Sequence, residues 1–227
     1  MSAPAAHALS IEVALPKGPQ AIGAEWTVPA DAAATVALTH GAGTGREHPF
    51  LAGLATALHR ADVATLVFDL PYRAAGRRMP GPAAHAVAAW RAVFARLDVL
   101  EAPGPRVAAG KSYGGRMASM AAAEGAIDPA GLVYLGYPLH PPGSPDTVRA
   151  AHLPDIAAPQ LFVSGTRDPF VDPHNQLDAV VATCPRARIA WIEGGDHSFA
   201  VAGRRSPADV IGAGLAPLVA EFARSLA

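Results

Sequence analysis

Apolar residues along the chain form two kinds of run, and the two kinds alternate. Short, nearly continuous apolar runs are typical of strands covered on both faces. Longer runs with apolar residues at helical spacing indicate amphipathic helices. The predicted strands are Leu9–Leu15, Glu25–Val28, Thr35–Thr39, Thr65–Leu70, Arg106–Ala109, Leu132–Leu135, Gln160–Ser164 and Arg188–Ile192. The predicted helices are His48–Arg60, Ala83–Leu100, Tyr113–Glu124, Pro173–Thr183 and Pro207–Leu226.

This alternation predicts an α/β fold, with a mostly parallel central sheet of about eight strands and helices on both faces. No helix separates the first two strands, so we expect them to pair antiparallel at one edge. We expect one domain over residues 1–227. The Pro- and Gly-rich segments Ala74–Pro82 and Leu139–Pro145 each follow a strand, at the edge where α/β proteins bind ligands. No insertion is long enough for a large lid, so an open site is expected.

Composition narrows the class of protein further. The chain is 51% hydrophobic and 16% charged, which allows a sizeable core and excludes wholesale disorder. A net charge of −1 argues against a nucleic-acid partner. The single cysteine, Cys184, excludes a disulfide framework, and the histidines form no helical metal motif, so no metal or other cofactor is expected. The chain shows neither a signal-peptide pattern nor a run of about 18 apolar residues, so we expect a cytoplasmic protein with no membrane partner.

One short motif carries chemistry. Gly110-Lys111-Ser112-Tyr113-Gly114 matches G-x-S-x-G, and it lies between a predicted strand and a predicted helix. Glycines two residues either side of Ser112 remove the Cβ atoms that would clash at so sharp a turn. The start of the following helix then directs backbone N–H groups at a developing oxyanion. The motif predicts Ser112 as a nucleophile.

Two competing motifs fail on spacing. A phosphate-binding loop ending at Gly110-Lys111-Ser112 needs glycine at 105, where the chain has Pro105. A dinucleotide-binding turn starting at Gly41 needs glycine at 46, where the chain has Arg46.

A serine nucleophile needs a base and an acid that orients the base. Asp168 follows the strand Gln160–Ser164, and His197 follows Arg188–Ile192, so both lie just past the carboxyl end of a strand, in the order Ser, Asp, His. Taken singly, Asp168 could be a turn residue before proline and His197 a surface histidine. Asp196 is a rival acid, but a sequence neighbour rarely reaches the far nitrogen of the next ring.

The oxyanion needs two backbone donors. Tyr113, directly after the nucleophile, supplies the first. His40-Gly41-Ala42-Gly43 follows a strand and matches the H-G-G-G type of loop, so we expect the second donor to be Ala42, with Gly43 as the alternative. His40 is expected to brace this loop.

The chain resembles the α/β-hydrolase superfamily over essentially its full length. More narrowly, it is similar to the dienelactone-hydrolase-like branch of small bacterial hydrolases, which shares a domain with a eukaryotic chromatin-complex subunit. A dienelactone hydrolase carries cysteine as its nucleophile, where this chain has Ser112. The resemblance implies the α/β-hydrolase fold. The segments that carry it are THGAG at 39–43, FDLPYRAAGRRMP at 68–80, AGKSYGGRMAS at 109–119, LGYPLHPPG at 135–143, GTRDPF at 165–170 and GGDHSF at 194–199.

Other residues are candidates for substrate binding. Arg73, Arg77 and Arg78 follow a strand and could clamp a carboxylate or phosphate, or belong to a solvated loop. Tyr137 and His140 could line the pocket or only pack their loop.

Together these features predict a cofactor-free serine hydrolase that cleaves a carboxylic ester or thioester of a small acyl substrate. Two alternatives stay open: a non-catalytic hydrolase-fold scaffold that binds protein, and an acyltransferase or peptidase on the same fold. The protein is expected to be a monomer or a small homo-oligomer.

Overall fold

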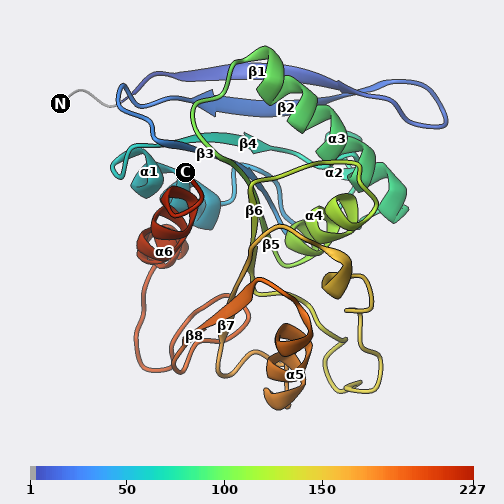
Figure 1. The fold of residues 1–227 in the computed structure, drawn as a ribbon, viewed down its shortest axis with the longest axis vertical. Helices are drawn as coiled ribbons and strands as arrows, with labels where there is room; N and C mark the ends of the chain where they lie inside the picture. The colour runs from blue at the N-terminus through green and yellow to red at the C-terminus, as the bar shows by residue number, and fades with distance from the viewer. Residues whose placement is uncertain (1–3) are drawn as a thin grey trace.

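The computed structural model describes residues 4–227 (Figure 1). Its strands are β1 (Ala6–Val13), β2 (Gln20–Thr27), β3 (Ala34–Thr39), β4 (Val63–Phe68), β5 (Arg106–Lys111), β6 (Gly131–Leu135), β7 (Gln160–Gly165) and β8 (Ala187–Ile192). Its helices are α1 (Pro49–His59), α2 (Pro71–Ala74), α3 (Ala83–Val99), α4 (Tyr113–Ala123), α5 (Asn175–Thr183) and α6 (Ala208–Arg224), with a short 3₁₀ helix, η1 (Leu153–Asp155).

All eight strands form one sheet in the order β1-β2-β4-β3-β5-β6-β7-β8. β1 and β2 pair antiparallel, β2 pairs antiparallel with β4, and the remaining neighbours are parallel. The predicted fold class is therefore confirmed, including the antiparallel edge. The carboxyl ends of β3 and β5 to β8 lie along one edge of the sheet, and the loops that leave this edge form the site.

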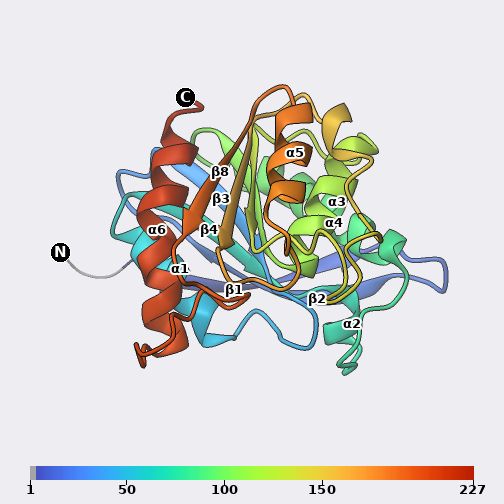
Figure 2. The same cartoon turned by 90° about the horizontal axis from the view of Figure 1, so that it is seen from below.

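Helices cover both faces of the sheet (Figure 2). On one face α1 and α6 pack side by side, with Leu54 of α1 and Val219 of α6 buried against the sheet. On the other face lie α3, α4 and α5, with Trp90 of α3 fully buried. The central strands are buried along their whole length, because side chains from both of their faces enter an apolar cluster.

The structure differs from the sequence prediction mainly at the edge of the sheet. β2 begins at Gln20 and not at Glu25, because it pairs with β1 along its full length and alternates buried and exposed side chains. Such alternation lacks the continuous apolar run by which the inner strands were predicted. The pattern also missed α2 and η1, since a helix of one turn is too short to show periodicity. Within residues 4–227, no helix is long and apolar enough to cross a membrane.

Candidate active site

Ser112 lies at a sharp turn between β5 and α4. Its backbone has φ 48° and ψ −115°, a region that residues other than glycine rarely occupy. Two glycines allow the turn. A Cβ on Gly110 would lie 2.3 Å from the backbone nitrogen of Gly115, and a Cβ on Gly114 would lie 2.5 Å from the carbonyl oxygen of His40. The predicted strand–turn–helix setting of Ser112 is thus present.

The structure brings the predicted acid and base together with Ser112. Ser112 Oγ lies 2.9 Å from His197 Nε2, and His197 Nδ1 lies 2.7 Å from Asp168 Oδ2. Asp168 is fully buried, and its other carboxylate oxygen accepts the Phe170 N–H at 2.9 Å. When Nδ1–H donates to Asp168, Nε2 keeps the lone pair that can accept a proton from Ser112.

Asp196, the neighbouring carboxylate, shapes the turn that carries His197. Its Oδ1 accepts the N–H groups of Ser198 at 2.7 Å and Ala200 at 3.0 Å. These bonds hold Phe199 at φ 63°, an unusual value for a bulky residue. The geometry therefore pairs the imidazole with Asp168, the acid that the sequence analysis preferred.

The residue that follows β6, Gly136, lies beside the imidazole of His197 and carries no side chain. Gly136 follows β6 with φ +70°, and a Cβ there would lie 3.4 Å from His197 Nδ1 and 3.1 Å from Lys111 Nζ. Because β6 separates β5 from β7 in the sheet, the imidazole reaches Ser112 across the end of β6.

Lys111 is a site residue that sequence reasoning missed. Its ammonium donates to the carbonyl oxygen of His197 at 2.6 Å and lies 5.4 Å from the centre of the Phe199 ring. Burial lowers the pKa of Lys111 from 10.5 to about 8, although the carboxylates of Asp168 and Asp196 act in the opposite direction. Its place directly before Ser112 was the available signal, and the sequence analysis considered it only within the rejected phosphate loop.

Two backbone N–H groups are available beside Ser112. Tyr113 is the first residue of α4, so its N–H has no acceptor within the helix. Ala42 lines the same cavity as Ser112, whereas Gly43, the alternative donor, lines a neighbouring cavity. This placement favours Ala42 over Gly43 as the second donor.

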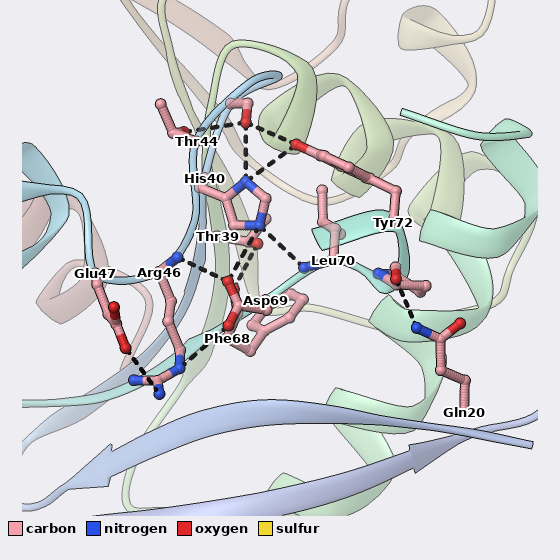
Figure 3. A network of polar contacts seen from close by, with 12 residues as sticks. Gln20, Thr39, His40, Thr44, Arg46, Glu47, Phe68, Asp69, Leu70 and Tyr72 are labelled. Atoms are coloured by element: carbon pink, nitrogen blue, oxygen red, sulfur yellow. Dashed lines mark hydrogen bonds and ion pairs between the residues drawn. The ribbon is translucent and has the colours of Figure 1, made fainter. Parts of the chain in front are cut away.

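His40 braces the loop that carries Ala42, as expected (Figure 3). His40 is fully buried, and its Nε2 accepts the Leu70 N–H at 3.0 Å. The ring proton is therefore on Nδ1, which donates to the carbonyl oxygen of Gly41 at 2.8 Å. The hydroxyls of Tyr72 and Thr44 donate to the same oxygen at 3.0 and 3.2 Å. Burial lowers the pKa of His40 below its ordinary 6.5, which favours the neutral ring that these bonds require.

A cavity of about 500 Å³ opens beside Ser112. One part is polar and contains the nucleophile and the imidazole, and the other is formed by the first turns of α1 and α6. Among residues 4–227, no group of three or more His, Cys, Asp or Glu side chains could hold a metal ion. The lining residues are His40, Gly41, Ala42, Thr44, His48, Phe50, Leu51, Lys111, Ser112, Phe170, His197, Ser198, Ser206, Ala208 and Ile211.

The three arginines proposed as an anion clamp lie outside this cavity. Arg73 lines a neighbouring cavity of about 610 Å³, which shares Thr44 and His48 with the first. Arg77 and Arg78 are exposed and line neither cavity. The anion clamp stays a hypothesis. Of the three arginines, Arg73 alone lines the cavity next to the one beside Ser112.

Tyr137 and His140 are buried in the loop after β6. The Tyr137 hydroxyl donates to the carbonyl oxygen of Arg149 at 2.8 Å, and its ring packs edge-on against Phe162 at 5.7 Å. His140 donates its backbone N–H to Phe170 O at 3.2 Å. Neither side chain lines the cavity beside Ser112, so their contacts here are those of loop packing.

The strand order, the strained serine between β5 and α4, and the loops after β7 and β8 together define the α/β-hydrolase class of proteins. The chain belongs to this family, because the family model described as the alpha/beta hydrolase domain matches residues 32–211. Membership supports a hydrolase.

Solved structures share the fold over nearly the whole chain. A dienelactone hydrolase from Anabaena variabilis is 21% identical, with a TM-score of 0.75 and 97% of each chain covered. An esterase domain from Rhodothermus marinus is 15% identical, with a TM-score of 0.70, covering 97% of this chain and 98% of its own. A serine hydrolase without a lid from Xanthomonas campestris is 19% identical, with a TM-score of 0.64, covering 85% and 87%. The resemblance inferred from the sequence is confirmed.

Proposed function

We propose that the protein is a serine hydrolase that cleaves a carboxylic ester or thioester of a small substrate through an acyl-enzyme on Ser112. The observation that carries this proposal is the hydrogen-bonded series from Ser112 through His197 to the buried Asp168, at 2.9 and 2.7 Å. Family membership and the fold shared with an esterase domain and a dienelactone hydrolase agree with ester chemistry.

The first half of the reaction forms the acyl-enzyme. His197 Nε2 accepts the hydroxyl proton of Ser112 while Oγ attacks the carbonyl carbon. The Asp168 carboxylate stabilises the imidazolium that forms and fixes its orientation. The N–H groups of Tyr113 and Ala42 receive the oxyanion, and each such donor typically contributes about 10²–10³ in rate. The imidazolium then returns its proton to the departing alcohol or thiol.

The second half releases the acid. Water enters the cavity, His197 accepts its proton, and the hydroxide oxygen attacks the acyl carbon. The tetrahedral intermediate collapses with return of the proton to Ser112 Oγ, so that a carboxylic acid leaves and the enzyme is regenerated.

Substitution of the nucleophile tests the proposal. Ser112→Ala should lower kcat for an activated ester such as 4-nitrophenyl acetate by about 10⁴- to 10⁶-fold, because members of such a series act as a unit. A fluorophosphonate probe should label the native protein and not Ser112→Ala. Ser198, the exposed serine beside His197 in the same cavity, provides the control, and Ser198→Ala should still be labelled. Retention of a tenth of the activity by Ser112→Ala would exclude Ser112 as nucleophile.

The same experiments separate the alternatives. A protein-binding scaffold predicts neither labelling nor turnover. An acyltransferase predicts that an added alcohol diverts the acyl group into a new ester, which product analysis detects. A peptidase predicts faster cleavage of the matched amide than a serine esterase would give.

A further inference from the structure

The cavity beside Ser112 extends well beyond the reacting groups. Its far part is formed by Phe50 and Leu51 at the start of α1 and by Ala208 and Ile211 at the start of α6. Ala208 and Ile211 are only partly buried, although they pack against the apolar cluster on this face of the sheet. The far part is therefore an apolar recess that the chain itself leaves unfilled.

Close helix packing fixes the shape of this recess. A Cβ on Gly212 would lie 2.0 Å from the carbonyl oxygen of Phe50, and a Cβ on Gly53 would lie 2.0 Å from that of Asp209. The backbones of α1 and α6 are thus in direct contact at the recess. The Phe50 ring also stacks on Phe199, two residues past His197, with ring centres 5.9 Å apart. This stacking contact connects the recess to the loop that carries His197.

The charge of the lining selects a class of substrate. Among residues 4–227, the cavity lining contains no arginine, aspartate or glutamate, and its histidines are His40, His48 and His197. His48 is the N-cap of α1, and its Nδ1 accepts the Phe50 N–H at 3.3 Å. The one lysine of the lining, Lys111, directs its ammonium at the carbonyl oxygen of His197. Arg46 and Arg73 line the neighbouring cavity, where Asp69 and Glu47 also lie and where Arg46 pairs with Asp69 at 3.2 Å. An anionic group in the recess would lose water without gaining an arginine or lysine partner.

We propose that the recess between α1 and α6 binds an uncharged, apolar substituent of the ester, and that Ile211 sets the length that fits. The proposal rests on the proposed function, since it assigns a substrate class to the same site. The apolar group could belong to the acid or to the alcohol, and the two sources are separated by experiment. Each buried methylene should raise kcat/KM roughly fourfold until the recess is full.

The test uses two homologous series of neutral esters. One lengthens the acyl chain of 4-nitrophenyl esters from acetate to octanoate, and the other lengthens the alkyl chain of acetate esters. Each is measured on the native protein, on Ile211→Trp, which fills the recess, and on Ile211→Ala, which enlarges it. Val210→Trp is the matched control, because Val210 is the adjacent residue of α6 and is 54% exposed. A hemisuccinate ester of butyrate size supplies the anionic comparison.

We expect kcat/KM to rise with chain length in one series, which identifies the group that occupies the recess. Ile211→Trp should lower the ratio of kcat/KM for the long esters to kcat/KM for the acetate by more than tenfold. Ile211→Ala should move the optimum to longer chains, and Val210→Trp should match the native protein. If the acyl series shows the rise, the hemisuccinate should react at least tenfold more slowly than the butyrate.

Either of two results would overturn the recess proposal: no dependence on chain length in either series, or equal losses on short and long esters in Ile211→Trp. Turnover of acetate that depends on Ser112 would in that case leave the proposed function intact. If no ester is turned over, binding of straight-chain alkyl amides to Ser112→Ala, measured by calorimetry, tests the recess separately. Affinity should rise with chain length and be lost in the Ile211→Trp double variant, and a flat series would reject the proposal.

Discussion

Lys111 is the residue whose charge state bears most directly on the proposed reaction. Its ammonium nitrogen lies 3.1 Å, and the imidazole of His197 lies 3.4 Å, from the Cβ position of Gly136. An ammonium there disfavours the imidazolium that forms in the transition state, while Asp168 favours it. Because burial lowers the pKa of Lys111 to about 8, this opposing charge disappears as the pH rises through 8.

We therefore expect kcat/KM for a neutral ester to rise severalfold between pH 7 and about 9, after subtraction of spontaneous hydrolysis. Lys111→Met, which carries no charge at any pH, should lack this step. If kcat/KM of Lys111→Met rose by the same factor near pH 8, the rise would belong to another titratable group.

The buried ring of His40 contributes to the stability of the protein toward acid. Burial lowers the pKa of His40 in the folded state below its ordinary 6.5, so the unfolded chain binds the proton more readily. The resulting stability is fully present above pH 6.5 and is lost as the pH falls through and below that value. Protonation also removes the acceptor for the Leu70 N–H, since Nε2 then carries a proton.

Denaturant titrations between pH 7 and 5 should show the free energy of unfolding falling with pH. His40→Gln should lower that free energy by about 1–3 kcal/mol at pH 7, the cost of a buried group without its partner. The variant should also show a shallower pH dependence, with the part due to His59 and His152, whose pKa values burial also lowers, left in place. An unchanged slope would remove His40 from this account.

Among the elements, the contact between α1 and α6 depends on Gly53 and Gly212. Gly212 faces the carbonyl oxygen of Phe50, whereas Gly214, two residues along the same helix, has nothing within 4 Å of its Cβ position. Gly212→Ala should destabilise the protein by about 1–3 kcal/mol, because the added methyl group forces the helices apart. Gly214→Ala should stabilise it by about 0.5–1 kcal/mol through helix propensity alone. Thermal unfolding of both variants measures the contrast, and similar shifts would show that the helices are not in contact there.

How far the sequence predicts each element depends on how local its signal is. The inner strands were found because they are continuously apolar, and the Ser112 turn because its glycines lie within five positions of one another. The paired carboxylate and imidazole followed from chain order, since parallel strands end at one edge. The recess could not be predicted, because Phe50 and Ile211 lie far apart in the sequence and line one cavity only because α1 and α6 pack together. Tyr137 and His140 were candidates by their place after β6, but the direction of a side chain in an irregular loop has no periodic signal.

At the scale of the whole molecule, one sheet is shared by two apolar clusters. Trp90 and Phe68 belong to the cluster under α3, and Leu54 and Val219 to the cluster under α1 and α6. Alternate residues of the same strands enter both clusters, so neither can lose its packing without disturbing the other. The prediction of a single domain over residues 1–227 would follow from this arrangement.

Equilibrium unfolding in urea should then give one transition, with the same midpoint by tryptophan fluorescence and by far-ultraviolet circular dichroism. Leu54→Ala, in the α1 cluster, should lower that common midpoint and cost about 2–5 kcal/mol. Two separated transitions, or a midpoint that shifts for one probe only, would indicate parts that unfold independently.

The absence of a side chain at Gly136, the residue after β6, has an evolutionary consequence. A side chain at Gly136 would strain the backbone at φ +70° and place its Cβ 3.1 Å from Lys111 Nζ and 3.4 Å from the imidazole of His197. We expect one change of codon there to lower the proposed activity while Ser112, Asp168 and His197 all persist in the gene. A descendant of this chain could thus become a binding protein with every signature residue intact, and an inventory of those three positions would not reveal it.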